Sequence, residues 1–318
     1  MPSLRRLSVS LIVTLVLAAA ANAAGQSTGV AFDQLDKIAF AGTTISLDSF
    51  AKDRADILAA SSSSQYPASG DDPLQQTMQA TGLGALMKGS VLRYSYLGDW
   101  SRIDDPVKNT ATITRPDLHQ VIYLDLANKT YRVADAATVA ETDPASQFAK
   151  MFGSMGGAMP KGPGSAVMTL KGSHASLPSR QYEGLALSGM TTTVSTVITK
   201  NTGSCPALDS TLTVVTYTAP TLSAPKALQA SAKGLADSPV GAAPMLGGCH
   251  MKQVKVGEMP SMGKDSAMYV YRSIQTEGRF NALAGPKISI VSERGNIKSL
   301  SDADKSLFDI PAGFTKAP

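Results

Sequence analysis

The sequence is poor in the residues that most enzymes and metal proteins use for chemistry. It contains three histidines, two cysteines and one tryptophan in 318 residues, and charged residues make up 17% of it. The histidines, His119, His174 and His250, are far apart and show no His-Glu-x-x-His spacing, which excludes the common zinc-hydrolase motif. No Gly-x-Gly-x-x-Gly fingerprint occurs either. These absences predict a protein that is not an enzyme and has no cofactor.

Two local patterns resemble functional motifs, but the secondary structure predicted around them does not support a functional site. Gly25–Gly29 matches Gly-x-Ser-x-Gly, but a nucleophile elbow follows a strand, and no strand is predicted before this segment. Asp99, Asp104 and Asp105 gather around a predicted turn. Such acids can bind calcium or act as paired carboxylates, yet acids in turns more often cap the local backbone. We therefore expect no catalytic or metal site at either place.

The first 23 residues have the three parts of a secretory signal peptide. Arg5 and Arg6 form a basic start, Leu7–Ala21 is uncharged and mostly apolar, and Ala21–Ala23 is a small-x-small cleavage site. The apolar stretch is shorter than the roughly 18–20 residues that span a bilayer. We expect an exported protein, periplasmic rather than fully secreted, with 24–318 as the mature chain and no transmembrane segment after cleavage.

The mature chain is nearly neutral. Loss of Arg5 and Arg6 leaves 27 basic residues against 25 acidic ones, a net charge of +2. Nucleic-acid binding needs a clustered basic face, so this balance argues against a nucleic-acid partner. The length of the mature chain is sufficient for a substantial core, in one large domain or two small ones.

Strand signals dominate the chain. Leu92, Tyr94 and Tyr96 alternate with polar residues, and so do Ile122, Leu124 and Leu126, which is the period of half-buried strands. Extended segments are also expected at 37–47, 110–115, 129–133, 167–171, 182–187, 191–200, 211–218, 251–256, 267–274 and 287–292. The short connections between many of them predict antiparallel pairing.

Helix signals are few. Short helices are expected within 48–65, after Asp72-Pro73, over 143–151, over 226–233 and after the capping-box sequence Ser301–Asp304. Antiparallel strands with separate helices define an α+β class that is mainly β, and a sheet of ten to twelve strands is expected to curl. We expect a single domain over 24–318, with loop excursions at 136–165 and 219–250.

Sulfur-containing residues form two groups. Met151, Met155 and Met159 recur every four residues. The second group surrounds Cys249 and consists of Met245, His250, Met251, Met259 and Met262. Thioether, imidazole and thiolate groups suit copper(I), whereas methionine also fills irregular apolar gaps. Copper(I) binding is a minor alternative, and we expect no resident metal.

Three stretches resemble one bacterial family. They are Tyr94–Asp104, Val121–Tyr131 and Leu307–Phe314, and together they resemble a secreted family catalogued as a domain of unknown function. That family is similar to the periplasmic lipoprotein carriers (Lol-type). The resemblance implies an open half-barrel, in which helices cover the concave face of a curved antiparallel sheet and acyl chains bind in the concavity. This chain is longer than the carriers, and no carrier signature residue maps onto it.

The leading hypothesis is an exported, non-enzymatic protein that binds a lipid or another apolar ligand in the concavity of the sheet. The candidate lining residues are Leu92, Tyr94, Tyr96, Ile122, Leu124 and Leu126. The same residues can instead form a solid core with no ligand. A second alternative is a structural module that docks an envelope protein through edge strands or the methionine-rich loop.

We predict a disulfide between Cys205 and Cys249, because exported proteins meet an oxidising environment. Free thiols or soft metal ligands are the alternatives. In the chain-entropy model, closing a loop of this length stabilises the fold by about 4 kcal/mol, so Cys205→Ser should lower the free energy of unfolding by about that amount. Intact mass measured after thiol alkylation, with and without reductant, checks the bond. Two alkylated cysteines in the unreduced exported protein would contradict it.

Overall fold

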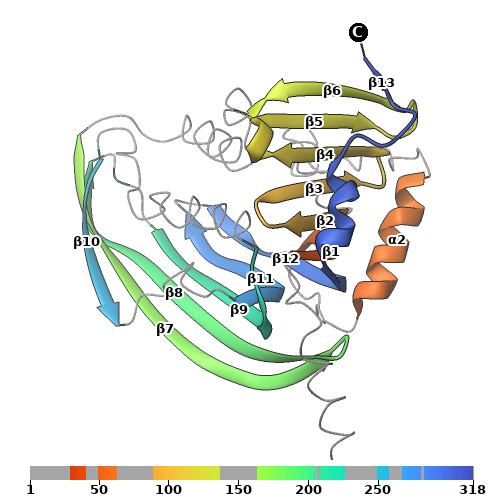
Figure 1. The fold of residues 1–318 in the computed structure, drawn as a ribbon. Coiled ribbons are helices and arrows are strands. Elements are labelled where there is room, and N and C mark those ends of the chain that lie inside the picture. The colour runs from red at the N-terminus through yellow and green to blue at the C-terminus, as the bar shows by residue number, and fades with distance from the viewer. Residues whose placement is uncertain are drawn as a thin grey trace, which may run out of the picture.

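The computed structural model describes residues 29–40, 49–62, 89–136, 163–203, 205, 208–225, 249–257, 267–280 and 283–317. Its strands form one thirteen-stranded sheet in the order β10-β7-β8-β9-β11-β12-β1-β2-β3-β4-β5-β6-β13. The sheet is open and strongly curved, with long strands sweeping through one half and short strands stacked in the other (Figure 1). The predicted class, mainly β with one curved open sheet and few helices, is confirmed.

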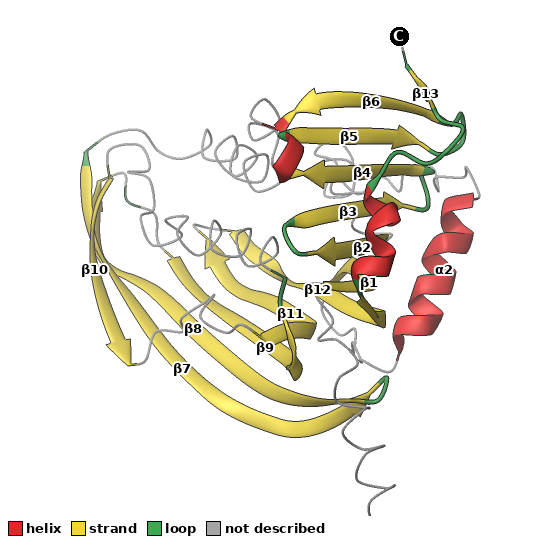
Figure 2. Ribbon diagram, viewed as in Figure 1, coloured by secondary structure: helices red, strands yellow, loops and turns green. Residues whose placement is uncertain are grey.

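The secondary structure is dominated by strands (Figure 2). The strands are β1 (Gly29–Phe40), β2 (Ser90–Leu97), β3 (Trp100–Asp105), β4 (Thr110–Arg115), β5 (Gln120–Asp125), β6 (Thr130–Asp135), β7 (Gly164–Tyr182), β8 (Leu185–Gly203), β9 (Leu208–Ser223), β10 (Cys249–Gly257), β11 (Ala267–Phe280), β12 (Leu283–Leu300) and β13 (Thr315–Lys316). The helices are α2 (Phe50–Ser62) and two 3-10 helices, η2 (Pro116–Leu118) and η5 (Asp302–Phe308). Within the described ranges, no helix is long and apolar enough to cross a membrane.

Strand pairing differs from the prediction at the two edges of the sheet. The ten inner pairings are antiparallel, as expected, but β10 pairs with β7 and β13 pairs with β6 in parallel. Neither edge strand directly follows its partner in the sequence. Parallel pairing requires such a crossover, whereas a tight turn allows antiparallel pairing alone. The fully antiparallel sheet was therefore wrong for the two outermost strands.

Several boundaries also differ from the prediction. The first strand is β1 at Gly29–Phe40, whereas the sequence predicts extended chain over 37–47. β7 and β8 are each 19 residues long and replace three shorter predicted strands. Pro178 lies in β7 at a break in register, where a strand tolerates the missing N–H. β9 continues to Ser223, so the chain is still a strand at the start of the predicted excursion over 219–250.

Two predicted helices are confirmed, and the others lie outside the described residues. α2 occupies most of the predicted segment 48–65. η5 begins with the predicted capping box, in which the Ser301 N–H donates to Asp304 Oδ2 at 2.8 Å. The helices expected after Asp72-Pro73, over 143–151 and over 226–233 lie outside the described residues, as do residues 1–28.

A row of directly paired residues defines one face of the sheet across seven strands. In order from β7 to β2 the row is Leu177, Gly189, Tyr217, Tyr271, Glu293, Leu35 and Val91. α2 packs on this face, where Phe50 and Ile57 form a cluster with Leu35 and Val91. A Cβ atom at Gly189 would lie 2.5 Å from the Tyr217 ring, so only glycine lets that ring contact Leu177 across β8. We call this side the helix face.

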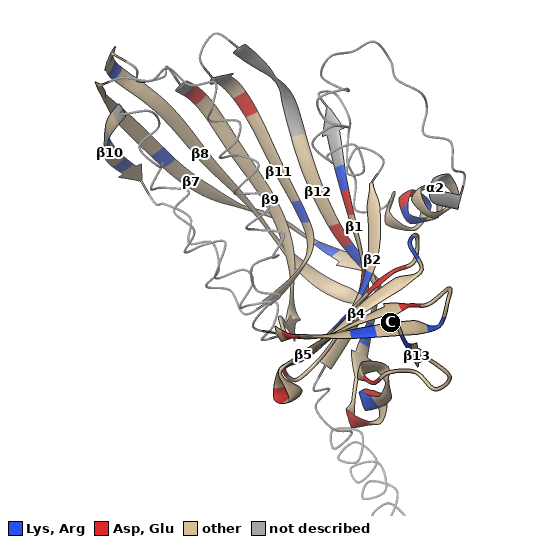
Figure 3. Cartoon of the chain, turned by 90° about the horizontal axis from the view of Figure 1, so that it is seen from above, with Lys and Arg blue, Asp and Glu red and all other residues tan. Residues whose placement is uncertain are grey.

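A buried carboxylate fastens α2 to the helix face. Asp33 of β1 is 2% exposed, and it accepts hydrogen bonds from Arg54 Nε of α2 at 2.8 Å and from Arg93 Nε of β2 at 2.9 Å. Asn296 Nδ2 of β12 donates a third, at 2.8 Å. Burial raises the pKa of Asp33, but these hydrogen bonds and the two guanidinium charges together lower it by more. The pKa of Asp33 therefore lies below its ordinary value. Charged segments of β1, β12 and α2 accordingly lie close together in Figure 3.

η5 closes a second core, in the short-stranded half of the same face. Phe308 is fully buried against Ile113 of β4 and against Ile122 and Leu124 of β5. Arg102 Nη1 donates to the Leu307 carbonyl at 2.9 Å, which holds the 3-10 helix against β3.

Cys205 lies just beyond the end of β8 and packs in a small core with Ala166, Met168 and Ile198. It is disulfide-bonded, and the sequence contains one other cysteine, Cys249, at the first position of β10.

We predict that Asp33→Asn lowers the free energy of unfolding by about 3 kcal/mol at pH 7, because two arginines lose a buried anionic partner. The pKa of Asp33 is lowered in the folded state, so its contribution is present above the ordinary aspartate pKa and is lost as pH falls toward the folded pKa. Urea unfolding at pH 7 and pH 3 measures both effects. The matched control is Asp56→Asn, which removes an exposed ion pair to Lys52 and should change stability little. Equal effects of the two variants would contradict the anchoring role.

Candidate functional site

The opposite side of the same strands carries a cluster of tyrosines and arginines. Three rows of residues paired across neighbouring strands form this cluster. The first row pairs Tyr94 with Phe32, the second contains Leu92, Gln34 and Arg294, and the third contains Ser90, Asp36, Ser292 and Arg272. Ring centroids lie 5.5 Å apart for Phe32 and Tyr94, and 6.2 Å apart for Tyr94 and Tyr96. These distances are typical of interacting aromatic side chains. We call this side the arginine face.

Arg294 is almost completely buried, at 1% exposure. Its guanidinium carbon lies 3.4 Å from the centroid of Tyr269 and 4.6 Å from that of Phe32. Its Nε donates to Gln34 Oε1 at 3.0 Å, and its Nη1 donates to the Tyr269 carbonyl at 3.1 Å. Burial lowers the pKa of Arg294, since desolvation disfavours a charge. Within the described residues, the guanidinium is stabilised by rings and neutral acceptors and forms no ion pair.

Arg272 of β11 contacts the same tyrosine. Its guanidinium carbon lies 4.2 Å from the Tyr269 centroid, and the side chain is half-buried with no ion pair in the described part of the chain. The nearby carboxylate, Asp36, is engaged elsewhere: Gln34 Nε2 donates to it at 2.9 Å, and Ser292 Oγ also donates to it. The arginine face therefore carries two guanidinium groups whose positive charges are not neutralised by an ion pair.

Tyr94 and Tyr96 stay neutral over the physiological range. Burial raises the pKa of Tyr96 to about 12 and raises that of Tyr94 further. The site can thus offer aromatic surface, hydroxyl groups and positive charge, which are the properties that bind an amphipathic anion.

The structure divides the six predicted lining residues between the two faces. Tyr94 shares a row with Tyr123, through Ile103 and Thr112. Because successive residues of a strand point to opposite faces, Ile122 and Leu124 lie on the other side of the sheet. Leu92, Tyr94 and Tyr96 belong to the arginine face, whereas Ile122, Leu124 and Leu126 belong to the core beneath η5. The expectation that all six line one concavity was therefore wrong.

The two arginines and Tyr269 were not predicted from the residue pattern. One signal was present: Glu293 and Arg294 interrupt the apolar run of β12 with adjacent opposite charges. Charges inside a buried strand are rare unless they are stabilised, so such a pair indicates a special environment on both sides of the sheet. Pairing with β1 and β11, which supplies that environment, is not visible in the sequence.

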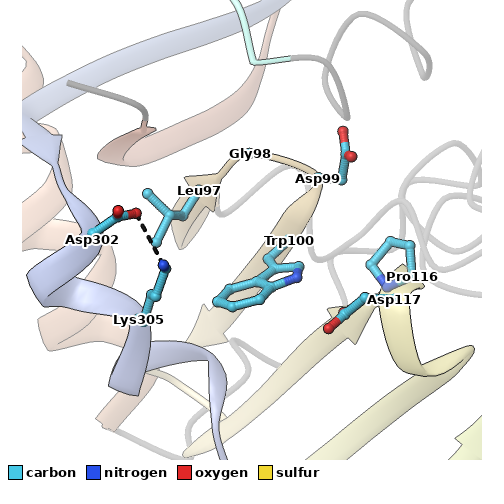
Figure 4. A pocket seen from close by; sticks show the side chains of 8 residues that line it. All are labelled: Leu97, Gly98, Asp99, Trp100, Pro116, Asp117, Asp302 and Lys305. Carbon is cyan, nitrogen blue, oxygen red and sulfur yellow. Dashed lines mark ion pairs between the residues drawn. The ribbon is translucent and has the colours of Figure 1, made fainter. Parts of the chain in front are cut away.

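A second feature is an open surface pocket around Trp100, with a volume of about 510 Å³. It is lined by Leu97, Gly98, Asp99, Trp100, Pro116, Asp117, Asp302 and Lys305. Asp302 and Lys305 lie on one side of the indole, and Pro116 and Asp117 lie on the other (Figure 4).

Most charges at this pocket are already paired. Arg115 stacks 4.1 Å from the Trp100 centroid and binds Asp117 at 2.9 Å, while Lys305 pairs with Asp302 at 3.3 Å. The groups around the indole thus neutralise each other, which makes this pocket a weaker candidate than the arginine face.

The other acids of the predicted turn have local partners. Asp104 binds Arg102 at 2.6 Å, and Asp105 Oδ1 accepts the N–H groups of Val107 and Lys108 at 3.1 and 3.0 Å. This is the local role that acids usually have in turns.

No candidate metal site is found in the described ranges, where no three His, Cys, Asp or Glu residues gather closely enough to hold an ion. The methionines considered for copper(I) lie outside the description: Met151, Met155, Met159, Met245, Met259 and Met262, together with the side chain of Met251. His250 of β10 is exposed.

Comparison with known proteins gives no further guide. A scan against protein-family models finds no match, and a search of curated proteins finds no similar sequence. The resemblance to a secreted family therefore stays a prediction.

We predict that the Arg294 site requires a flat, delocalised group more than a positive charge. Arg294→Lys should lower the free energy of unfolding by about 1–3 kcal/mol, because an ammonium is more strongly hydrated and cannot stack on the rings. Arg294→Met should change it by less than about 1 kcal/mol, since an apolar side chain often replaces a buried charge without loss. Urea denaturation compares the three proteins. A lysine variant more stable than the methionine variant would contradict this account.

Proposed function

We propose that this chain is an exported, non-enzymatic binding protein that takes an anionic amphiphile on the arginine face. The ligand class is an alkyl chain that carries a carboxylate or phosphate head group. The observation that carries the proposal is the position of Arg272, a half-buried guanidinium without an ion pair in the described structure, beside the ring of Tyr269 on a curved open sheet. The proposal includes no catalytic step and no cofactor.

The apolar part of the ligand is matched by Leu92 and Tyr94. Both are half-buried, and they flank the buried Phe32 and Tyr96 on the same face. Burial of hydrocarbon contributes about 0.8 kcal/mol per methylene, so a chain of moderate length binds detectably even where contact is partial. Tyrosine favours such a boundary because its ring is apolar and its hydroxyl is polar.

The charged part of the ligand is matched by Arg272. Guanidinium groups bind carboxylates and phosphates through two parallel hydrogen bonds. Arg272 forms no ion pair with Asp36 in the described structure, and the Asp36 carboxylate accepts hydrogen bonds from Gln34 and Ser292 instead. Arg294 lies behind Tyr269 and adds positive potential without needing direct contact with the ligand.

A docking role for the edge of the sheet is the second candidate. β10 is an edge strand whose Val254 and Val256 are 37% and 45% exposed, and it carries Lys252 and Lys255. Edge strands present backbone groups that can pair with another extended chain. In this role the chain would be a structural module that binds another envelope protein through β10, independently of the arginine face.

We predict that dodecanoate binds at least about tenfold more tightly than dodecanol, because only the acid can pair with Arg272. Arg272→Gln should reduce dodecanoate binding about tenfold and leave dodecanol binding unchanged. Isothermal titration below the critical micelle concentration measures both ligands. The matched control is Arg180→Gln, which removes an arginine stacked 5.4 Å from Tyr217 on the helix face.

The outcomes separate the two parts of the proposal. If neither compound binds the wild-type protein, the binding function is wrong. If both bind equally and Arg272→Gln has no effect, the ligand is apolar but not anionic. If Arg180→Gln weakens binding as much as Arg272→Gln does, the arginine face is not the site.

A further inference from the structure

Glu293 is a buried carboxyl group without a hydrogen-bond partner. Its side chain is 1% exposed, and neither carboxyl oxygen is hydrogen-bonded within the described structure. Its strand neighbours on the helix face are Tyr271 of β11 and Leu35 of β1. An ionised carboxylate in such surroundings loses its hydration and has no hydrogen bond to replace it, and this cost outweighs the attraction of Lys37, so the site favours the neutral acid.

The cover over this part of the sheet includes α2. Leu35, adjacent to Glu293, packs against Phe50 and Ile57 of the helix, and Tyr182 of β7 joins the same cluster. Two positions along β12, a Cβ atom at Gly295 would lie 2.4 Å from the Phe50 ring, which shows how closely the helix approaches the strand. α2 is therefore part of the cover that keeps water from this face of the sheet near Glu293.

The attachment of α2 to the sheet combines apolar packing with ion pairs. It is 13 residues long, and an isolated helix of that length is marginal in water. In the described structure its buried apolar contacts come from Phe50 and Ile57. Its polar attachments are the Arg54–Asp33 and Lys37–Asp53 ion pairs. A segment attached in this way can open locally while the sheet stays folded.

We propose that α2 is a pH-sensitive latch, which closes over the sheet while Glu293 is protonated and is released when Glu293 ionises. Ionisation is favoured in the open state, where water solvates the carboxylate. The latch is independent of the ligand proposed above, because it acts on the helix face.

The other charged or titratable groups near Glu293 on the helix face belong to the elements packed around it. They are Lys37 and Asp33 on β1, Asp53 and Arg54 on α2, Arg93 on β2, Tyr271 on β11, Tyr217 on β9, and Arg180, Tyr182 and Glu183 at the β7 end. The pKa values of Asp33 and Asp53 are lowered, because burial, which raises them, is outweighed by hydrogen bonds and nearby cations. Burial raises the pKa of Tyr271. These three groups do not titrate between pH 4.5 and 7.

Burial raises the pKa of Glu293 itself from 4.5 to about 7. The closed state thus binds the proton more tightly than the open state. Closure is strongest below the open-state pKa, weakens as pH rises through the window between about 4.5 and 7, and is constant above it. Over the whole window the opening equilibrium of α2 should rise by about one to two orders of magnitude.

Hydrogen exchange of the intact chain tests the latch. Protection factors, corrected for intrinsic rates, are measured at pH 5 and pH 8 for amides of α2 and for amides of β4 and β5 as an internal reference. In the wild type, α2 protection should fall about tenfold to a hundredfold more than the reference. Glu293→Gln should remove this difference, because glutamine does not ionise. The matched control is Asp56→Asn, which changes an exposed acid on the same helix and should keep the wild-type response.

Two results would overturn the proposal. The first is equal α2 protection at both pH values in the wild type, or the same pH response in Glu293→Gln. The second comes from infrared spectroscopy of the wild-type protein, which needs no variant. If Glu293 is protonated in the closed state, the spectrum at pH 6 should show the carbonyl band of a protonated carboxyl group, at a pH where ordinary carboxyl groups are ionised. The absence of that band would mean that Glu293 is ionised in the closed state.

Discussion

The burial of β12 on both faces is the constraint on which the rest of the structure depends. Glu293 and Arg294 are adjacent in this strand, point to opposite sides, and are each 1% exposed. They cannot pair with each other because successive side chains of a strand lie on different faces. Each face must therefore accommodate one group separately. The arginine face does so with rings and neutral acceptors around the guanidinium, while the helix face surrounds the carboxyl group with apolar and aromatic neighbours.

The two faces consequently have different physical characters. On the helix face, Asp33 collects two arginines and an asparagine, and this network attaches α2 to three strands. On the arginine face, positive charge is surrounded by tyrosines and has no carboxylate partner in the described chain. The helix face thus holds a helix through ionisable side chains, whereas the arginine face combines aromatic surface with positive charge.

Residue patterns predicted the parts of the fold that depend on neighbours in sequence. Alternation located β2 and β5, the Ser301 capping box located η5, and α2 occupied most of the predicted segment 48–65. The prediction failed where a residue distant in sequence determines whether a side chain is buried and hydrogen-bonded. β1 contains Asp33 and Asp36, and its polar composition concealed a central strand because their hydrogen-bond partners are up to about 260 positions away. The predicted lining residues failed for the same reason, since alternation assigns relative faces within a strand but not between strands.

The sequence by itself determined that this chain forms a mainly β fold with a curved sheet, because period-two patterns and short turns are local properties. It also supplied every group of the candidate site, without showing that they meet. Tertiary structure alone decided that β1 lies between β12 and β2, that the edge strands pair in parallel, and that Glu293 and Arg294 are buried back to back. The physical reason is that strand order and burial depend on contacts between residues hundreds of positions apart, and these set the hydration and the charge state of each group.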